Sequence, residues 1–228
     1  MMKRTLIYLF IISILYSCGL EKKEVVTEKW EDGSTKVSFT YENPDDTTKY
    51  VRTSFHTNGK IESKGFVVDG EKDGLWKWWY DNGKKQDLAH LNNGIYEGTR
   101  KHWRKDGTLR LVEIIEGNCH GECCDGKLIF YDDSGVKLLK YQMKNGDYNG
   151  FGYGYHKDGS IERKFYYENG KKKGMSYEYH TNGKISASGN YINDLEQGKW
   201  IYKDSLGTIF AYEYFENGKS INVEKVNR

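Results

Sequence analysis

Residues 175–198 read MSYEYHTNGKISASGNYINDLEQG, and close variants of this stretch recur along the chain at a fixed spacing. One series of glycines comprises Gly59, Gly83, Gly107, Gly135, Gly159, Gly183 and Gly207, with steps of 24 residues apart from a single step of 28. A second series with the same steps comprises Gly74, Gly98, Gly126, Gly150, Gly174 and Gly198. Two turns per period predict two strands per tile, and a fixed period of this length is typical of a repeat array.

The turns themselves indicate β-hairpins. Asn58-Gly59 and Asn182-Gly183 stand between runs rich in Tyr, Ile and Val, which is the strongest short-range hairpin signal. We expect type I′ turns at the first glycine series and a looser turn at the second, as in 167–174. The predicted fold is all-β: an elongated antiparallel β-hairpin array of about seven tiles of 24 residues.

Two columns of apolar residues keep the same register in successive tiles. The first ladder consists of Phe55, Trp79, Trp103, Tyr131, Tyr155 and Tyr179. The second ladder consists of Val67, Leu91, Ile115, Met143, Tyr167, Tyr191 and Phe215. Because an isolated hairpin is marginal in water, we expect both ladders to form a stacked core between tiles. The alternative is an exposed aromatic strip that stacks on sugars.

Composition and charge narrow the class of partner. The chain has 228 residues, of which 37% are hydrophobic and 30% charged, with one proline, and this composition favours a folded chain. The 35 Lys and Arg residues nearly balance the 33 Asp and Glu residues, giving a net charge of +2. With no basic field to attract phosphates, we do not expect nucleic acid as a partner.

The N-terminus indicates export and lipid attachment. Lys3 and Arg4 precede a short apolar run at 6–15, which is about half the length that a membrane-spanning helix needs. The following residues, 15–19 (LYSCG), resemble the lipobox of bacterial lipoproteins, which implies that Cys18 is lipidated after removal of a signal peptide at 1–17. We expect a tether at 18–29 and a lipid-anchored location in the bacterial cell envelope, periplasmic or surface-exposed. The alternatives are an uncleaved anchor and a plain signal peptide.

The tile motif has a counterpart in a known family. Residues 177–185 (YEYHTNGKI) are repeated as 54–61 (SFHTNGKI), as 78–84 (WWYDNGK) and as 154–161 (GYHKDGSI). This motif resembles the MORN-repeat variant of the bacterial YwqK-type antitoxin family. The resemblance covers a repeat domain at 50–219, with 30–49 as a degenerate first repeat and 220–228 as a C-terminal tail. It implies a string of antiparallel hairpins and, at the level of function, an antitoxin-like protein.

The single longer step falls in a cysteine-bearing loop. Between Gly98 and Gly126 the spacing is 28 residues, and the loop at 117–126 contains Cys119, His120, Cys123 and Cys124. Thiolates and imidazole are ligands that zinc prefers, but no paired Cys-x-x-Cys knuckle is present. In an exported protein we expect a disulfide from Cys119 to Cys123 or Cys124, with one thiol left over, and we expect no metal.

No enzyme motif accompanies the repeat. The chain has no Gly-x-Ser-x-Gly elbow, no phosphate-binding glycine loop and no His-Glu-x-x-His pair, so we expect neither catalysis nor a cofactor. His56, His156 and His180 share one tile position, which favours a structural role, and the lysines after the turn glycines, such as Lys60 and Lys84, are expected to be solvated.

We therefore predict a sheet surface for an unknown protein partner. The alternative is saccharide or peptidoglycan binding through four exposed tryptophans, namely Trp76, Trp78, Trp103 and Trp200.

Overall fold

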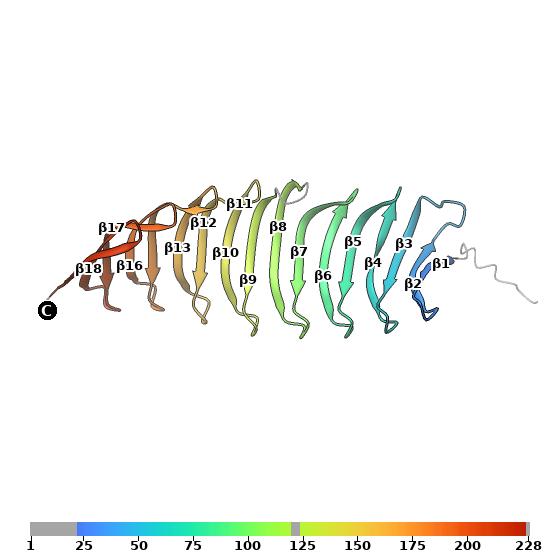
Figure 1. Ribbon diagram of the computed structural model, residues 1–228, viewed down its shortest axis with the longest axis horizontal. Coiled ribbons are helices and arrows are strands. Elements are labelled where there is room, and N and C mark those ends of the chain that lie inside the picture. The colour runs from blue at the N-terminus through green and yellow to red at the C-terminus, as the bar shows by residue number, and fades with distance from the viewer. Residues whose placement is uncertain (1–21, 120–123, 227–228) are drawn as a thin grey trace, which may run out of the picture.

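The computed structural model describes residues 22–119 and 124–226 and shows one elongated antiparallel sheet of 19 strands (Figure 1). The all-β hairpin array predicted from the repeat is confirmed. The strands are β1 (Lys23–Lys29), β2 (Thr35–Tyr41), β3 (Lys49–Phe55), β4 (Ile61–Val68), β5 (Glu71–Trp79), β6 (Lys85–Asn92), β7 (Ile95–Trp103), β8 (Leu109–Cys119), β9 (Asp125–Tyr131), β10 (Lys137–Lys144), β11 (Asp147–Tyr148), β12 (Gly150–Tyr155), β13 (Ile161–Glu168), β14 (Lys171–Lys172), β15 (Gly174–Tyr179), β16 (Ile185–Ile192), β17 (Leu195–Lys203), β18 (Ile209–Glu216) and β19 (Lys219–Lys225).

Strand order in space follows strand order in the chain. Curved strands lie side by side along the long axis, from β1 at one end to the C-terminal strands at the other (Figure 1). β11 and β12 both pair with β10, and β14 and β15 both pair with β13, so each of these two pairs is one strand line with a break. Each tile therefore contacts mainly the tiles before and after it, as in other repeat arrays.

The two kinds of turn are the reverse of the prediction. At the first glycine series, Gly59 has a φ of 78° while Asn58 keeps a negative φ, so this is a longer turn that ends in a left-handed glycine. The type I′ turn with two positive φ values occurs instead at the second turn, where Asn169 has a φ of 50° and Gly170 a φ of 77°. Both turns contain Asn-Gly, so the dipeptide alone does not distinguish them.

The longer turns bind one another along one side of the sheet. His56 Nε2 donates to the carbonyl of Trp79 in the next tile at 2.8 Å, and the same bond recurs from His156 and from His180. Asn58 Nδ2 donates to the carbonyl of Asp81 at 2.7 Å. The recurring histidines therefore have the structural role predicted for them.

The lysines after these turns are not simply solvated. Lys60 Nζ donates to the carbonyl of Asn82 at 3.0 Å and Lys184 Nζ to the carbonyl of Leu206 at 3.0 Å. The lysines are exposed, as expected, and their ammonium groups also bind the turn carbonyls of the neighbouring tile, which the prediction did not include.

The core lies on one side of the sheet, which we call the inner face and define by the second ladder. Val67, Leu91, Tyr167 and Tyr191 are buried there, and the other members of this ladder are half-buried. The first ladder is half-buried throughout, so the prediction that it also forms the core was wrong. Its members end the strands beside the longer turns, outside the buried clusters around Trp76 and Trp200.

Both ends of the array differ from the predicted boundaries. The expected tether at 18–29 contains β1, which pairs along its length with β2, because Val25, Val26 and Thr27 supply β-branched residues. A turn with the same bonds as the others, at Gly33, lies in the degenerate first repeat predicted at 30–49. The predicted tail contributes most of β19, whose residues are all exposed.

Candidate functional site

The inner face becomes charged in the middle of the array. Asp87 precedes the buried residues Ala89 and Leu91 at alternate positions of β6, so its side chain points to the same face. The register places His102 of β7 opposite Asp87, and Glu113 of β8 opposite Arg100. We call these four residues, Asp87, Arg100, His102 and Glu113, the ion-pair cluster.

The imidazole joins two carboxylates within this cluster. His102 Nδ1 contacts Asp87 Oδ1, and its Nε2 lies 3.1 Å from Glu113 Oε2. Arg100 Nη1 lies 3.4 Å from Glu113 Oε2, and Nη2 lies 3.9 Å from Asp87 Oδ1. The exposed fractions of the four side chains lie between 17% and 29%, so water reaches the cluster only in part.

These contacts shift two pKa values in opposite directions. Burial lowers the pKa of His102, but hydrogen bonds with Asp87 and Glu113 outweigh it, and the net pKa is raised. The hydrogen bond from His102 lowers the pKa of Glu113 against the opposing effect of burial. Both shifts favour an imidazolium between carboxylates, which is an ion pair that holds strands β6, β7 and β8 together.

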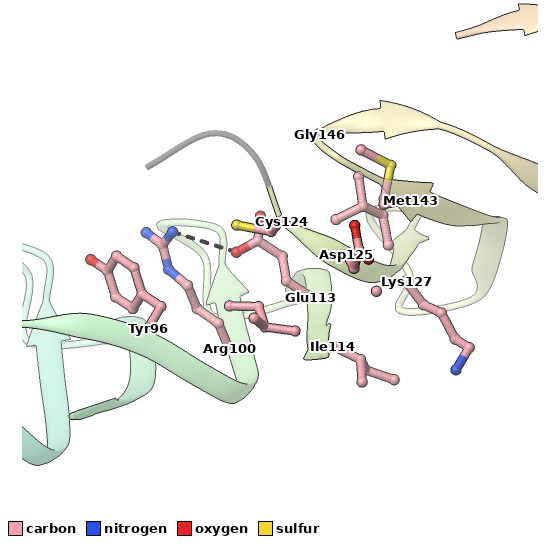
Figure 2. Close-up of a pocket in the computed structure, with 12 residues that line it drawn as sticks. Tyr96, Arg100, Glu113, Ile114, Cys124, Asp125, Lys127, Met143 and Gly146 are labelled. Atoms are coloured by element: carbon pink, nitrogen blue, oxygen red, sulfur yellow. Dashed lines mark hydrogen bonds and ion pairs between the residues drawn. The ribbon is translucent and has the colours of Figure 1, made fainter. Parts of the chain in front are cut away.

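Two hollows lie beside the cluster and share Tyr96 and Arg100. The larger, of about 320 Å³, we call the Cys124 hollow (Figure 2). It is lined by Tyr96, Arg100, Glu113, Ile114, Ile115, Cys124, Asp125, Gly126, Lys127, Leu128, Met143 and Gly146. The smaller, of about 150 Å³, we call the Lys72 hollow, and it is lined by Lys72, Trp78, Asp87, Tyr96 and Arg100.

Arg100 forms the wall between the two hollows. Figure 2 shows its guanidinium directed at the Glu113 carboxylate, with the Tyr96 ring beside it. The guanidinium carbon lies 4.5 Å from the centroid of that ring. Its Nε is buried and has no hydrogen-bond partner in the part of the chain that the structure describes. Cation–π contact and two carboxylates thus hold Arg100 in place.

Lys72 faces the Lys72 hollow from β5 without an acidic partner. Its Nζ lies 4.6 Å from the Trp76 ring and 5.2 Å from the Trp78 ring. Burial lowers the pKa of Lys72, and the positive charge of Arg52 lowers it further. Within residues 22–119 and 124–226, no carboxylate forms an ion pair with Lys72 or with Arg52. The hollow therefore concentrates positive charge beside aromatic rings.

The four predicted tryptophans do not form one exposed surface. Trp76 is 0% exposed and Trp200 is 4% exposed, so the expectation that they are accessible was wrong. Gly65 explains the burial, because a Cβ there would lie 2.2 Å from the Trp76 ring, and Gly189 has the same relation to Trp200. Trp78 and Trp103 are half-buried, and Trp78 borders the Lys72 hollow.

The cysteine loop falls mostly outside the described residues. Cys124 is disulfide-bonded and lines the Cys124 hollow. The backbone of Cys119 ends β8, whereas the side chains of Cys119, His120 and Cys123 lie outside the described part, so the pairing stays a prediction. In the residues that are described, no group of three or more His, Cys, Asp or Glu side chains is arranged to hold a metal ion.

The lipidation site also falls outside the description. Cys18 and the apolar run before it precede residue 22, where the described chain begins. From residue 22 onward, no described helix is long and apolar enough to cross a membrane.

The ion-pair cluster was not predicted from the sequence, although a signal for it exists. The inner-face position of Glu113 is occupied in other tiles by Gly65, Ala89, Tyr141, Phe165, Gly189 and Glu213. A charged residue at a position that is usually small or aromatic marks a tile with a polar inner face. Comparing the tiles at this position would have placed the Glu113 carboxylate on the inner face.

Fold and inner face together define an open β-hairpin repeat protein with a cationic, aromatic hollow on a single sheet. Three segments of the chain, 72–93, 160–177 and 172–193, match the MORN repeat variant. The first of these includes Lys72, Trp76 and Trp78. No curated protein matches the chain.

Proposed function

We propose that this protein is a non-catalytic interaction module that binds a protein partner on its inner face. MORN repeats are generally modules for interaction with proteins or membranes, and three segments match the variant of this repeat. The observation that carries the proposal is the Lys72 hollow, in which Lys72, Trp78, Tyr96 and Arg100 meet on the inner face. Trp, Tyr and Arg are the residues that most often dominate the energetics of protein–protein interfaces.

The geometry of the sheet supports a protein partner. Interior strands have their backbone groups paired with neighbours, so a ligand must bind through side chains and not through strand addition. Cation–π contacts hold Lys72 and Arg100 against rings, so little side-chain freedom remains to be lost on binding. An antitoxin-like role, in which the partner is a toxin, is the narrower form of this proposal.

The proposal includes a lipid anchor at Cys18 and residence in the bacterial cell envelope. It rests on the lipobox-like residues at 15–18 and the short apolar run before them. Each buried methylene of an acyl chain contributes about 0.8 kcal/mol to membrane binding, so attachment needs no membrane-spanning helix.

Metabolic labelling with an alkyne fatty acid tests the anchor. The native chain is expected to incorporate the label and Cys18→Ala to lose it, whereas Ser17→Ala keeps a small residue before the cysteine and is expected to retain it. Equal labelling of native chain and Cys18→Ala, or no labelling of either, would remove the anchor from the proposal.

Site-specific photocrosslinking in intact envelopes tests the partner. A photoreactive amino acid at Trp78 faces the Lys72 hollow, and the same group at Lys77, the exposed neighbour on the opposite face of β5, is the matched control. We expect one protein to be crosslinked from Trp78 and not from Lys77. Crosslinks from Lys77 alone would reject the inner face as the surface that binds the partner. Recovery of glycan fragments in place of protein would favour saccharide binding, for which only Trp78 and Trp103 of the four tryptophans remain accessible.

A further inference from the structure

Two hollows on the inner face each border a lysine at the same tile position, one on the strands that follow the lysine and the other on the strands that precede it, and their charges differ. Lys72 and Lys172 hold the same tile position, and each ammonium lies over two rings: Trp76 and Trp78 for Lys72, Phe165 and Tyr191 for Lys172. A hollow of about 400 Å³ lies beside Lys172. The two sites share a cation over aromatic rings, so their acids decide what else each can bind.

The site at Lys172 contains its own acids. Glu162 lines this hollow and pairs with Arg163 at 3.2 Å. Asp194 accepts a hydrogen bond from the backbone N–H of Lys172 at 2.8 Å. Glu162 therefore offsets Arg163, and Asp194 places a negative charge at the backbone of Lys172, although Lys172 Nζ itself forms no ion pair among the described residues.

The site at Lys72 lacks the equivalent acid. Gly94 stands at the tile position of Asp194, the acid that accepts from the backbone N–H of Lys172. The one carboxylate that lines the Lys72 hollow, Asp87, is already engaged by His102 and Arg100. The acids that flank Lys72 on β5, Glu71 and Asp73, alternate to the outer face of the sheet. Lys72 and its neighbour Arg52 are left without a carboxylate partner among the described residues.

We propose that the Lys72 hollow recognises an acidic peptide segment of the partner, with one Asp or Glu carboxylate seated between Lys72 and Arg100 and flanked by Trp78 and Tyr96. This inference rests on the proposed function and specifies its contact. A volume of about 150 Å³ admits a single acidic side chain, and Lys72, with Arg52 nearby, supplies positive charge that no carboxylate pairs with in the described part of the chain. The rings on either side exclude water from the pair, which strengthens it.

Peptide binding to the full chain in detergent tests this inference by fluorescence anisotropy. The probe is a fluorescein-labelled decapeptide of alternating Glu and Tyr, and its matched control replaces every Glu by Gln. We expect the Glu peptide to bind and the Gln peptide to bind at least about tenfold more weakly. Equal binding of the two peptides, or no binding of either at millimolar concentration, would overturn the inference.

Variants that change the charge of each hollow show which of the two binds the Glu peptide. Lys72→Gln is expected to weaken binding of the Glu peptide about tenfold or more, whereas Lys172→Gln changes it by less than about twofold. Gly94→Asp introduces the acid that stands at this tile position beside Lys172 and should abolish binding, while Gly94→Asn adds a neutral side chain of the same shape and should not. Both variants must displace the flexible Glu71 carboxylate, whose Oε2 lies 2.7 Å from an added Cβ, so the pair isolates the charge. Equal effects of Lys72→Gln and Lys172→Gln would place the interaction elsewhere.

Two further outcomes separate this inference from the proposed function. A protein crosslinked from Trp78 whose contacting segment carries no Asp or Glu would overturn the acidic peptide and leave the protein partner standing. Binding of galacturonate oligosaccharides that Lys72→Gln abolishes, without binding of the Glu peptide, would assign the hollow to a carboxylated sugar and reject both proposals.

Discussion

The Trp76 and Trp200 clusters are built alike but are stabilised differently. In each, an indole lies on the inner face across a glycine of the preceding strand, Gly65 for Trp76 and Gly189 for Trp200. The Trp76 cluster is completed by Val67, Ala89 and Leu91, whereas rings surround Trp200: Tyr191 at 5.4 Å and Phe215 at 6.0 Å between centroids. The repeat thus fixes where a side chain lies, and the neighbouring tiles decide what it contacts.

The two indoles also differ in one hydrogen bond. Trp76 Nε1 donates to the carbonyl of Phe66 at 2.8 Å. Trp200 Nε1 is buried without a partner among residues 22–119 and 124–226. A buried donor that lacks an acceptor loses its hydration without compensation. The same residue at the same tile position therefore contributes different amounts to the free energy of unfolding.

Removing the indoles should have the largest effect on stability. Trp76→Ala and Trp200→Ala each delete a buried side chain at the centre of a cluster, and each is expected to cost about 3–5 kcal/mol of unfolding free energy. Urea denaturation measures the cost, and hydrogen exchange shows which tiles open. Trp103→Ala, at a half-buried position, is the control and should cost clearly less. A loss below about 1 kcal/mol at Trp200 would show that its cluster is not part of the core.

Replacing the two glycines that face the indoles by alanine should have the second-largest effect on stability. A Cβ at Gly65 or Gly189 would meet the indole at 2.2 or 2.1 Å, so Gly65→Ala and Gly189→Ala are each expected to cost about 1–3 kcal/mol. Gly154→Ala is the matched control, because the nearest atom to its added Cβ is 3.6 Å away and its φ is not positive. Urea denaturation of Gly65→Ala combined with Trp76→Leu should recover part of the loss. Costs that simply add would mean that the two residues are not in contact.

Replacing each indole by phenylalanine should have a smaller effect, which measures the hydrogen bond from Trp76 to the Phe66 carbonyl. Trp76→Phe leaves the Phe66 carbonyl without its donor, whereas Trp200→Phe removes a donor that has no partner. Trp76→Phe should therefore destabilise the protein by about 1 kcal/mol more than Trp200→Phe, as measured by urea denaturation. Equal losses would show that the Trp200 donor is satisfied in solution.

The sequence predicted the parts of this fold that depend on period alone. The spacing of the turn glycines sets the register, and the register identifies the second ladder, from Val67 to Phe215, as the core column. It did not distinguish the two turns, because both contain Asn-Gly and differ only in how many residues separate the paired strands. It also overestimated the burial of the first ladder, because burial at a strand end depends on the curvature of the sheet.

The candidate site depends on contacts that the period does not predict. The ion-pair cluster takes Asp87 from β6, His102 from β7 and Glu113 from β8. Bulges in the register separate Leu88 from His90 and His102 from Trp103, so facing residues cannot be assigned by counting alone. The burial of Trp76 was missed for a related reason, because it requires the glycine on the neighbouring strand to be recognised as its partner.

The smallest expected effect is a pH dependence that distinguishes the ion-pair cluster from the equivalent positions beside Trp200. The pKa of His102 is raised in the folded state, so its stabilising charge is fully present below pH 6.5 and is lost as the pH rises through the folded value. The pKa of Glu113 is lowered, so its contribution is present above 4.5 and is lost as the pH falls through its folded value. Stability should therefore decline by about 0.2–1 kcal/mol as the pH rises above the folded value of His102, the range for partly exposed ion pairs.

Urea denaturation of the native chain and of His102→Gln, at pH values on either side of neutrality, measures this decline. The variant should lose most of the pH dependence, because glutamine can donate to Glu113 without titrating. The tile position of His102 is occupied near Trp200 by Tyr202, whose hydroxyl donates to Glu213 at 3.0 Å. Burial, followed by this hydrogen bond, raises the pKa of Tyr202 further above its ordinary value of 10.0, so that tile does not titrate near neutrality. Hydrogen exchange should therefore place the pH response in β6, β7 and β8, and an equal response in β16 to β18 would contradict the assignment to His102.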